Sequence, residues 1–151
     1  MSSDLANLYQ EVIIDHSRSP QNFRILEDPT GRAVGFNPLC GDQLTLYVKL
    51  SGDSIEDVAF QGSGCAISQA SASLMTTALK GRTREEALDL WGCVHAMLTG
   101  VPNDTIGSPE LGKLAVLSGV SEFPMRVKCA TLAWHTLQSA LEATGEHVST
   151  E

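Results

Sequence analysis

Four cysteines, at positions 40, 65, 93 and 129, are the residues of this 151-residue chain whose type best suits chemistry. A cysteine thiolate is both a nucleophile and a metal ligand. No two of the four are separated by only two residues, so the spacing favours neither a zinc-finger knuckle nor a redox pair. Two interpretations stay open at this point: scattered structural thiols, or one site assembled from distant segments.

Three of these cysteines lie in surroundings that favour a thiolate or a metal ligand. Cys40 is followed two residues later by Asp42, and Cys65 comes directly after Gly-Ser-Gly at the expected start of a helix. The free N–H groups and the dipole of a helix N-terminus stabilise a thiolate. Cys129 lies on another expected helix, and Arg126 precedes it by about one turn. Their joint occurrence, more than any single residue, indicates a shared site.

A tetrahedral zinc ion accepts cysteine sulfur together with aspartate oxygen. The candidate ligands are Cys40, Asp42, Cys65 and Cys129. Three thiolates and one carboxylate carry about two negative charges more than a divalent ion neutralises, which is costly near a core without cations nearby. Arg126 and Lys128 are placed to offset that charge. The sequence is therefore compatible with a zinc site in a cationic neighbourhood, and the interpretation of scattered structural thiols stays open.

The remaining thiol and the imidazoles lack such surroundings. A cytosolic cysteine is most often a small buried hydrophobe, and we expect this of Cys93, which lies beside the apolar stripe of its helix. The four histidines are expected to be structural or solvated.

The charge balance excludes some classes of partner. Ten Lys and Arg face 18 Asp and Glu, a formal charge of −8, which disfavours binding to a phosphate backbone. No run approaches the roughly 20 apolar residues of a membrane span, and the N-terminus lacks a basic-then-apolar leader. We therefore expect a cytoplasmic protein with neither a nucleic-acid nor a membrane partner.

The elements that must position these residues can be read from hydrophobic periodicity and from turn residues. The chain should form five helices. The first covers 4–16, the second runs from about Cys65 to Lys80, and the third begins at a capping box of Thr83 and Glu86 and runs through Leu98. The fourth covers about 111–117 and ends by Gly119, and the fifth covers about 125–143. A hairpin of two strands is expected over 44–50 and 55–60, and an irregular loop over 20–38. The prediction is an α+β fold, a small antiparallel sheet packed against helices, in one domain spanning 1–151.

Three separated segments, Leu39–Asp42, Gly62–Ser68 and Arg126–Trp134, resemble the U-type iron–sulfur assembly proteins (IscU and NifU N-terminal-like) in the right order. The resemblance extends over roughly residues 5–142 and is closest to the SufU type. Lys128 stands where IscU proteins carry a histidine, and the Leu-Pro-Pro-Val-Lys motif of IscU is absent. An insertion-like stretch lies at about 100–119, and the tail 144–151 is expected to be frayed.

This resemblance implies a zinc-dependent sulfur acceptor that works with a pyridoxal-phosphate cysteine desulfurase of the SufS type. It implies that zinc is held by Cys40, Asp42, Cys65 and Cys129. It further implies that Cys40 receives sulfur and passes it to a downstream iron–sulfur assembly scaffold. From the chemistry, we expect Arg126 to steady the thiolate or to contact the desulfurase, with a surface salt bridge as the alternative. The implied SufE/NifU-like fold agrees with the α+β prediction. Two alternatives stay open: a scaffold that builds a [2Fe–2S] cluster from iron on the same residues, and a zinc-stabilised interaction module without sulfur chemistry.

Overall fold

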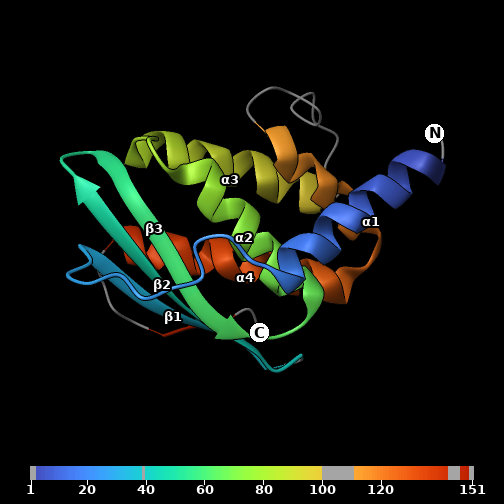
Figure 1. The fold of residues 1–151 in the computed structure, drawn as a ribbon, viewed down its shortest axis with the longest axis horizontal. Coiled ribbons are helices and arrows are strands. Elements are labelled where there is room, and N and C mark those ends of the chain that lie inside the picture. Colours follow the sequence, from blue (N-terminus) through green and yellow to red (C-terminus); the bar gives the residue numbers. More distant parts are fainter. Residues whose placement is uncertain (1–2, 39, 100–110, 143–146, 150–151) are drawn as a thin grey trace.

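The computed structural model describes residues 3–38, 40–99, 111–142 and 147–149. Its order of elements runs from an N-terminal helix through three strands to a series of helices and one short C-terminal strand (Figure 1). The elements are α1 (Ser3–Arg18), β1 (Gly31–Asn37), β2 (Asp42–Ser51), β3 (Ser54–Ser63), α2 (Ala66–Leu79), α3 (Arg84–Leu98), the 3₁₀ helix η1 (Gly112–Glu122), α4 (Pro124–Leu141) and β4 (His147–Ser149).

The sheet has the strand order β3-β2-β1-β4. Strands β2 and β3 form the expected hairpin, and β1 pairs with β2, both antiparallel. Leu44, Leu46 and Val48 alternate inward along β2, because successive side chains of a strand point to opposite faces. The prediction of a small antiparallel sheet packed against helices is confirmed.

Strand β1 lies inside the stretch 20–38, so the prediction of an irregular loop there is wrong for residues 31–37. Its glycines are typical of a loop in the sequence, but in the structure they mark close packing against α4. A Cβ atom at Gly31 would meet the backbone of Ala140, and one at Gly35 would meet the hydroxyl of Thr136. Glycine inside a strand often serves such a close approach of another backbone.

Strand β4 pairs in parallel with β1 at the sheet edge, with Val34 opposite His147. The prediction of a frayed tail over 144–151 is therefore wrong for residues 147–149. Residues 144–146 and 150–151 lie outside the described residues. A strand of three residues cannot be recognised in so short a segment, because the sequence signal of a strand needs a longer alternating run.

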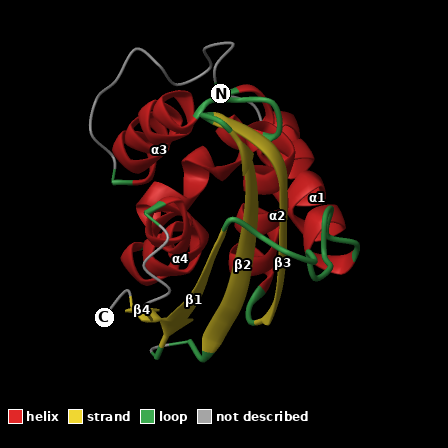
Figure 2. Ribbon diagram, turned by 90° about the vertical axis from the view of Figure 1, so that its left-hand side faces the viewer, coloured by secondary structure: helices red, strands yellow, loops and turns green. Residues whose placement is uncertain are grey.

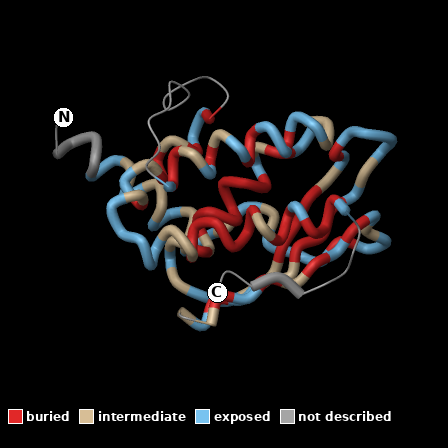
Figure 3. The backbone as a smooth tube through the Cα atoms, turned by 180° about the vertical axis from the view of Figure 1, so that it is seen from behind, coloured by how far each residue is buried: buried red, intermediate tan, exposed pale blue. Residues whose placement is uncertain are grey.

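The helices form two layers on one face of the sheet. Helices α2 and α4 pack directly against the strands, and α1, α3 and η1 pack against α2 and α4 from the outside (Figures 1 and 2). Buried residues concentrate in the central helices and on the inner side of the strands (Figure 3). The largest fully buried side chains include Trp134, Phe60 and Leu46.

The helix boundaries agree with the sequence in most places. The capping box is present, since Thr83 Oγ1 accepts from Glu86 N at 3.1 Å and Glu86 Oε1 accepts from Thr83 N at 2.9 Å. The helix predicted over 111–117 is a 3₁₀ helix that continues to Glu122 past Gly119, because Val120 also joins the core. Of the insertion-like stretch, residues 100–110 lie outside the described residues. No helix in the described ranges combines the length and the apolar character of a membrane span.

Candidate metal centre

The ends of four elements converge at one end of the sheet, where β1 ends and β2 begins. Strand β1 ends at Asn37, the turn to β2 carries Cys40 and Asp42, Cys65 caps the N-terminus of α2, and Cys129 lies in the second turn of α4. Residues 89 apart along the chain, Cys40 and Cys129, thereby become neighbours. The fold thus provides the convergence of remote segments that a shared site requires.

Three of the four predicted ligands form a close set. One ligand atom each from Cys40, Asp42 and Cys129 lies within 4.8 Å of the others, and the sulfurs of Cys129 and Cys40 are 3.2 Å apart. The ligands of a tetrahedral zinc ion, with Zn–S bonds of about 2.3 Å, lie at comparable mutual separations. These three donors therefore fit zinc in type and spacing, and a tetrahedral ion would take a fourth.

Cys65 lies just outside this close set but borders it. Its sulfur is 4.0 Å from Asp42 Oδ2 and accepts a hydrogen bond from Ser68 N at 3.5 Å. Because it caps α2, the sulfur of Cys65 occupies the position where the helix dipole favours negative charge.

Asp42 is held firmly although it is fully buried. Its Oδ1 accepts from Cys65 N at 2.8 Å, and its Oδ2 accepts from Asn37 Nδ2 at 3.3 Å. Gly64 packs directly on this carboxylate, so that a Cβ atom there would lie 2.9 Å from Asp42 Cγ. Burying an ionised carboxylate is costly unless a cation compensates it, which further supports a metal site here.

Asn37 is the site residue that the sequence did not reveal. It is fully buried, and its Nδ2 lies 3.3 Å from Asp42 Oδ2 and 3.5 Å from Cys129 Sγ. It sits in the stretch predicted as a loop, and an isolated asparagine before a proline is an ordinary turn signal. Only the discovery of β1 places it beside the ligands.

The electrostatics of the cluster oppose ionisation of Cys129 on its own. Burial, followed by hydrogen bonding with Cys40, Asp42 and Cys65, raises the pKa of Cys129 well above its ordinary value. Two or three anions cannot share so small a volume unless a cation joins them. A bound divalent ion reverses this preference by stabilising the thiolates, and its binding releases their protons.

Arg126, predicted to neighbour the thiolates, does so from one turn before Cys129. A hydrogen bond to Cys129, followed by the charges of the cysteines at 65, 129 and 40, raises the pKa of Arg126. The guanidinium itself is exposed to solvent. It therefore adds a positive charge on the solvent-exposed side of the cluster and is accessible to a partner.

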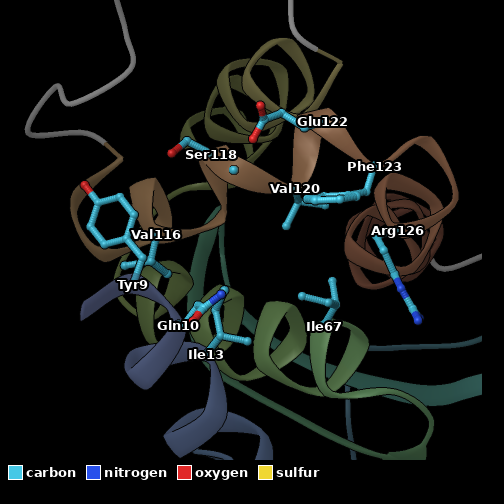
Figure 4. Close-up of a pocket in the computed structure, with 11 residues that line it drawn as sticks. Tyr9, Gln10, Ile13, Ile67, Val116, Ser118, Val120, Glu122, Phe123 and Arg126 are labelled. Atoms are coloured by element: carbon cyan, nitrogen blue, oxygen red, sulfur yellow. The ribbon is translucent and has the colours of Figure 1, made fainter. Parts of the chain in front are cut away.

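An apolar groove of about 400 Å³ opens beside Arg126. Its walls come from α1, α2, η1 and the start of α4, and Figure 4 shows Ile67, Val120 and Phe123 around it. Ile67 follows Cys65 by two residues, and 60% of Phe123 is exposed. Arg126 thus links the groove, which it lines, to the cysteine cluster, whose charges raise its pKa.

Cys93 lies on α3, is half-buried and packs against the hydrophobic core. Its position agrees with the structural role predicted for it.

Comparison with known proteins agrees with this arrangement. The family model for the NifU-like N-terminal domain matches residues 8–143. The zinc-dependent sulfurtransferase SufU of Bacillus subtilis is 44% identical over 140 residues, covering 93% of this chain and 93% of that protein. The iron–sulfur cluster assembly scaffold protein IscU of Streptococcus pyogenes is 42% identical over 149 residues, covering 97% of this chain and 92% of that protein.

A solved structure supports the same fold. The crystal structure assigned to an iron–sulfur cluster assembly scaffold protein for the SUF system of Fervidobacterium islandicum superposes with a TM-score of 0.78 at 39% identity, covering 87% of this chain and 94% of that one. The fold, the three cysteine segments and the family match agree. The chain belongs to the family of the NifU-like N-terminal domain, the U-type proteins of iron–sulfur cluster assembly.

Proposed function

We propose that this protein is a zinc-dependent sulfur acceptor that takes persulfide sulfur from a SufS-type, pyridoxal-phosphate-dependent cysteine desulfurase onto Cys40. It then passes the sulfur to a downstream iron–sulfur assembly scaffold. The observation that carries the proposal is the close set of Cys40, Asp42 and Cys129, bordered by Cys65. The similarity to a relative named as a zinc-dependent sulfurtransferase supports the same activity. The cytoplasm, as the site of this activity, stays a prediction.

In this proposal, zinc is held by Cys40, Asp42, Cys65 and Cys129. When bound, it keeps the thiols deprotonated and joins the segments that carry them. Cys65 and Cys129 are fixed by helices, whereas Cys40 lies in a turn next to Gly41, whose φ is +70°. Because Cys40 lies outside a helix and is only partly buried, the turn is well suited to present a sulfur that leaves and returns.

The transfer itself balances without any oxidant or reductant. The Cys40 thiolate attacks the outer sulfur of the desulfurase persulfide and forms a new S–S bond. The S–S bond within the donor breaks, and its electron pair leaves with the desulfurase cysteine as a thiolate. Cys40 then carries one added sulfur. Arg126, one turn before Cys129 and exposed to solvent, stabilises negative charge on the sulfurs during this exchange.

The apolar groove beside Arg126 supports a macromolecular donor. A desulfurase must bring its persulfide into bonding distance of Cys40, so its surrounding surface comes to lie on the face that carries the groove. Exposed Phe123 and Met125 (60% and 59%) flank the start of α4 there. An apolar side chain of the desulfurase would fill the groove, and an acidic one would pair with Arg126.

A second function is supported by the relative named as a scaffold protein, IscU of Streptococcus pyogenes. The same three thiols and one carboxylate would hold a [2Fe–2S] cluster, since such clusters are bound by cysteine thiolates. The two functions differ in the metal retained and in the fate of the sulfur.

Peptide mapping distinguishes these functions. Zinc-loaded protein is incubated anaerobically with a cysteine desulfurase and cysteine, and its peptides are then mapped by mass. We expect an increment of one sulfur on Cys40, retained in a Cys93→Ser control. An unmodified Cys40, together with the visible absorption of an iron–sulfur cluster after addition of iron, would overturn the sulfur-acceptor proposal in favour of the scaffold.

A further inference from the structure

A second group of potential metal ligands lies on the outer side of the helices, where α3 crosses α4. Trp91 of α3 stacks on Trp134 of α4, with ring centroids 5.7 Å apart and planes 14° apart. This stack lies where the two helices cross. Two imidazoles flank it.

His95 and His135 both contact Trp91. The ring of His95, one turn further along α3, lies edge-on at 5.3 Å, and that of His135 on α4 lies edge-on at 5.2 Å. Both also line one open hollow of about 440 Å³, together with Gln138, which follows His135 on α4 by three residues. The crossing therefore brings two imidazoles and an amide to one concave surface.

Within the described residues, the nitrogens of both imidazoles are free to bind a metal ion. The ring nitrogens of His95 and His135 have no hydrogen-bond or ion-pair partner within the described parts of the chain, where their recorded contacts are those with Trp91. Burial, followed by the charge of His95, lowers the pKa of His135. Both effects favour the neutral ring of His135, whose lone pair binds metals.

We propose that His95 and His135 form a second metal site, distinct from the cysteine centre, for a divalent transition ion that prefers imidazole, such as Ni²⁺ or Zn²⁺. The carbonyl oxygen of Gln138 and water complete the coordination. His95 is exposed, so its ring turns toward His135 at little cost. His135 is half-buried and supplies the fixed ligand.

The two tryptophans of the chain, Trp91 and Trp134, provide a local probe, because the sequence has no others. Zinc-loaded full-length protein is titrated with Ni²⁺, and tryptophan fluorescence is followed. We expect saturable quenching at one Ni²⁺ per chain, confirmed by calorimetry. His95→Ala and His135→Ala should each weaken binding at least about tenfold, as the loss of a ligand or its support typically does.

A gain-of-affinity variant makes the test independent of folding. Gln138→Glu places a carboxylate where the amide stood and should tighten Ni²⁺ binding several-fold. His147→Ala removes an imidazole from another part of the chain and should leave the titration unchanged. Zinc content is measured before and after, so that exchange at the cysteine centre is detected.

Two outcomes overturn the proposal. One is quenching that never saturates, or that is equal in the wild type, His95→Ala and Gln138→Glu. The other is Ni²⁺ uptake that matches zinc loss from the cysteine centre.

Discussion

Gly64→Ala should damage the metal centre while leaving the fold intact. The new Cβ atom would lie 2.9 Å from Asp42 Cγ and 3.0 Å from Asp42 Cβ, well inside an ordinary contact of about 3.5–4.0 Å between carbon atoms. The carboxylate must therefore move by several tenths of an ångström. Its 2.8 Å hydrogen bond from Cys65 N then lengthens, and Oδ2 leaves the close set of ligands.

The expected loss of zinc affinity is about 10- to 100-fold, the usual effect of disturbing the groups that orient a metal ligand. This corresponds to about 1.4–2.8 kcal/mol. Competition with a chromophoric chelator measures the affinity directly. Gly92→Ala is the matched control, because a Cβ atom there meets nothing within 4 Å. It lies within α3, so that substitution should leave zinc binding unchanged and stabilise the fold by about 0.5–1 kcal/mol.

A double-mutant cycle tests the cause. If Gly64→Ala acts through Asp42, it should have no further effect on zinc affinity in an Asp42→Ala background. Wild-type affinity in Gly64→Ala alone, or an equal loss in the two backgrounds, would refute the reasoning.

Three further predictions concern the surroundings of the site and the helices. Asn37→Ala removes the donor to Asp42 and should weaken zinc binding about tenfold in the same chelator assay; unchanged affinity would contradict its positioning role. Thr83→Ala breaks the capping box and should lower the free energy of unfolding in urea by about 1 kcal/mol without changing zinc affinity. His16 bonds Ser73 at 2.7 Å, and burial, followed by the charge of Lys113, lowers its pKa from 6.5. Because folding lowers the pKa of His16, neutral His16 contributes to the free energy of unfolding above pH 6.5. This contribution is lost as the pH falls below that value. On acidification, the free energy of unfolding measured in urea should therefore fall less in His16→Gln than in the wild type. An equal pH dependence of the two proteins would contradict this.

The parts of the fold with strong local signals could be predicted from the sequence. The alternation from Leu44 to Leu50 and the Thr83–Glu86 box are local patterns, and the structure confirms the strand and the helix start. Strand β1 was missed because its glycines serve contacts with α4, which only the three-dimensional structure reveals. Parallel pairing of β4 depends in the same way on the position of β1.

The candidate site shows the same division. Unusual neighbours drew attention to Cys40, Cys65 and Cys129, and the structure brings their segments together. The contribution of Asn37 depends on the end of β1, and the need for Gly64 depends on a buried carboxylate 22 residues earlier in the chain. Both are consequences of packing between distant segments, which no local pattern encodes.

The central claim is that three sulfurs and one carboxylate from remote segments hold a single zinc ion. X-ray absorption at the zinc edge of protein purified without added metal tests it most directly. We predict one zinc per chain with three sulfur donors at about 2.3 Å and one oxygen donor at about 2.0 Å. Replacement of Asp42 by alanine should leave the sulfur count unchanged, whereas Cys65→Ser should reduce it by one. A shell of nitrogen and oxygen alone, or a sulfur count unaffected by Cys65→Ser, would contradict the account.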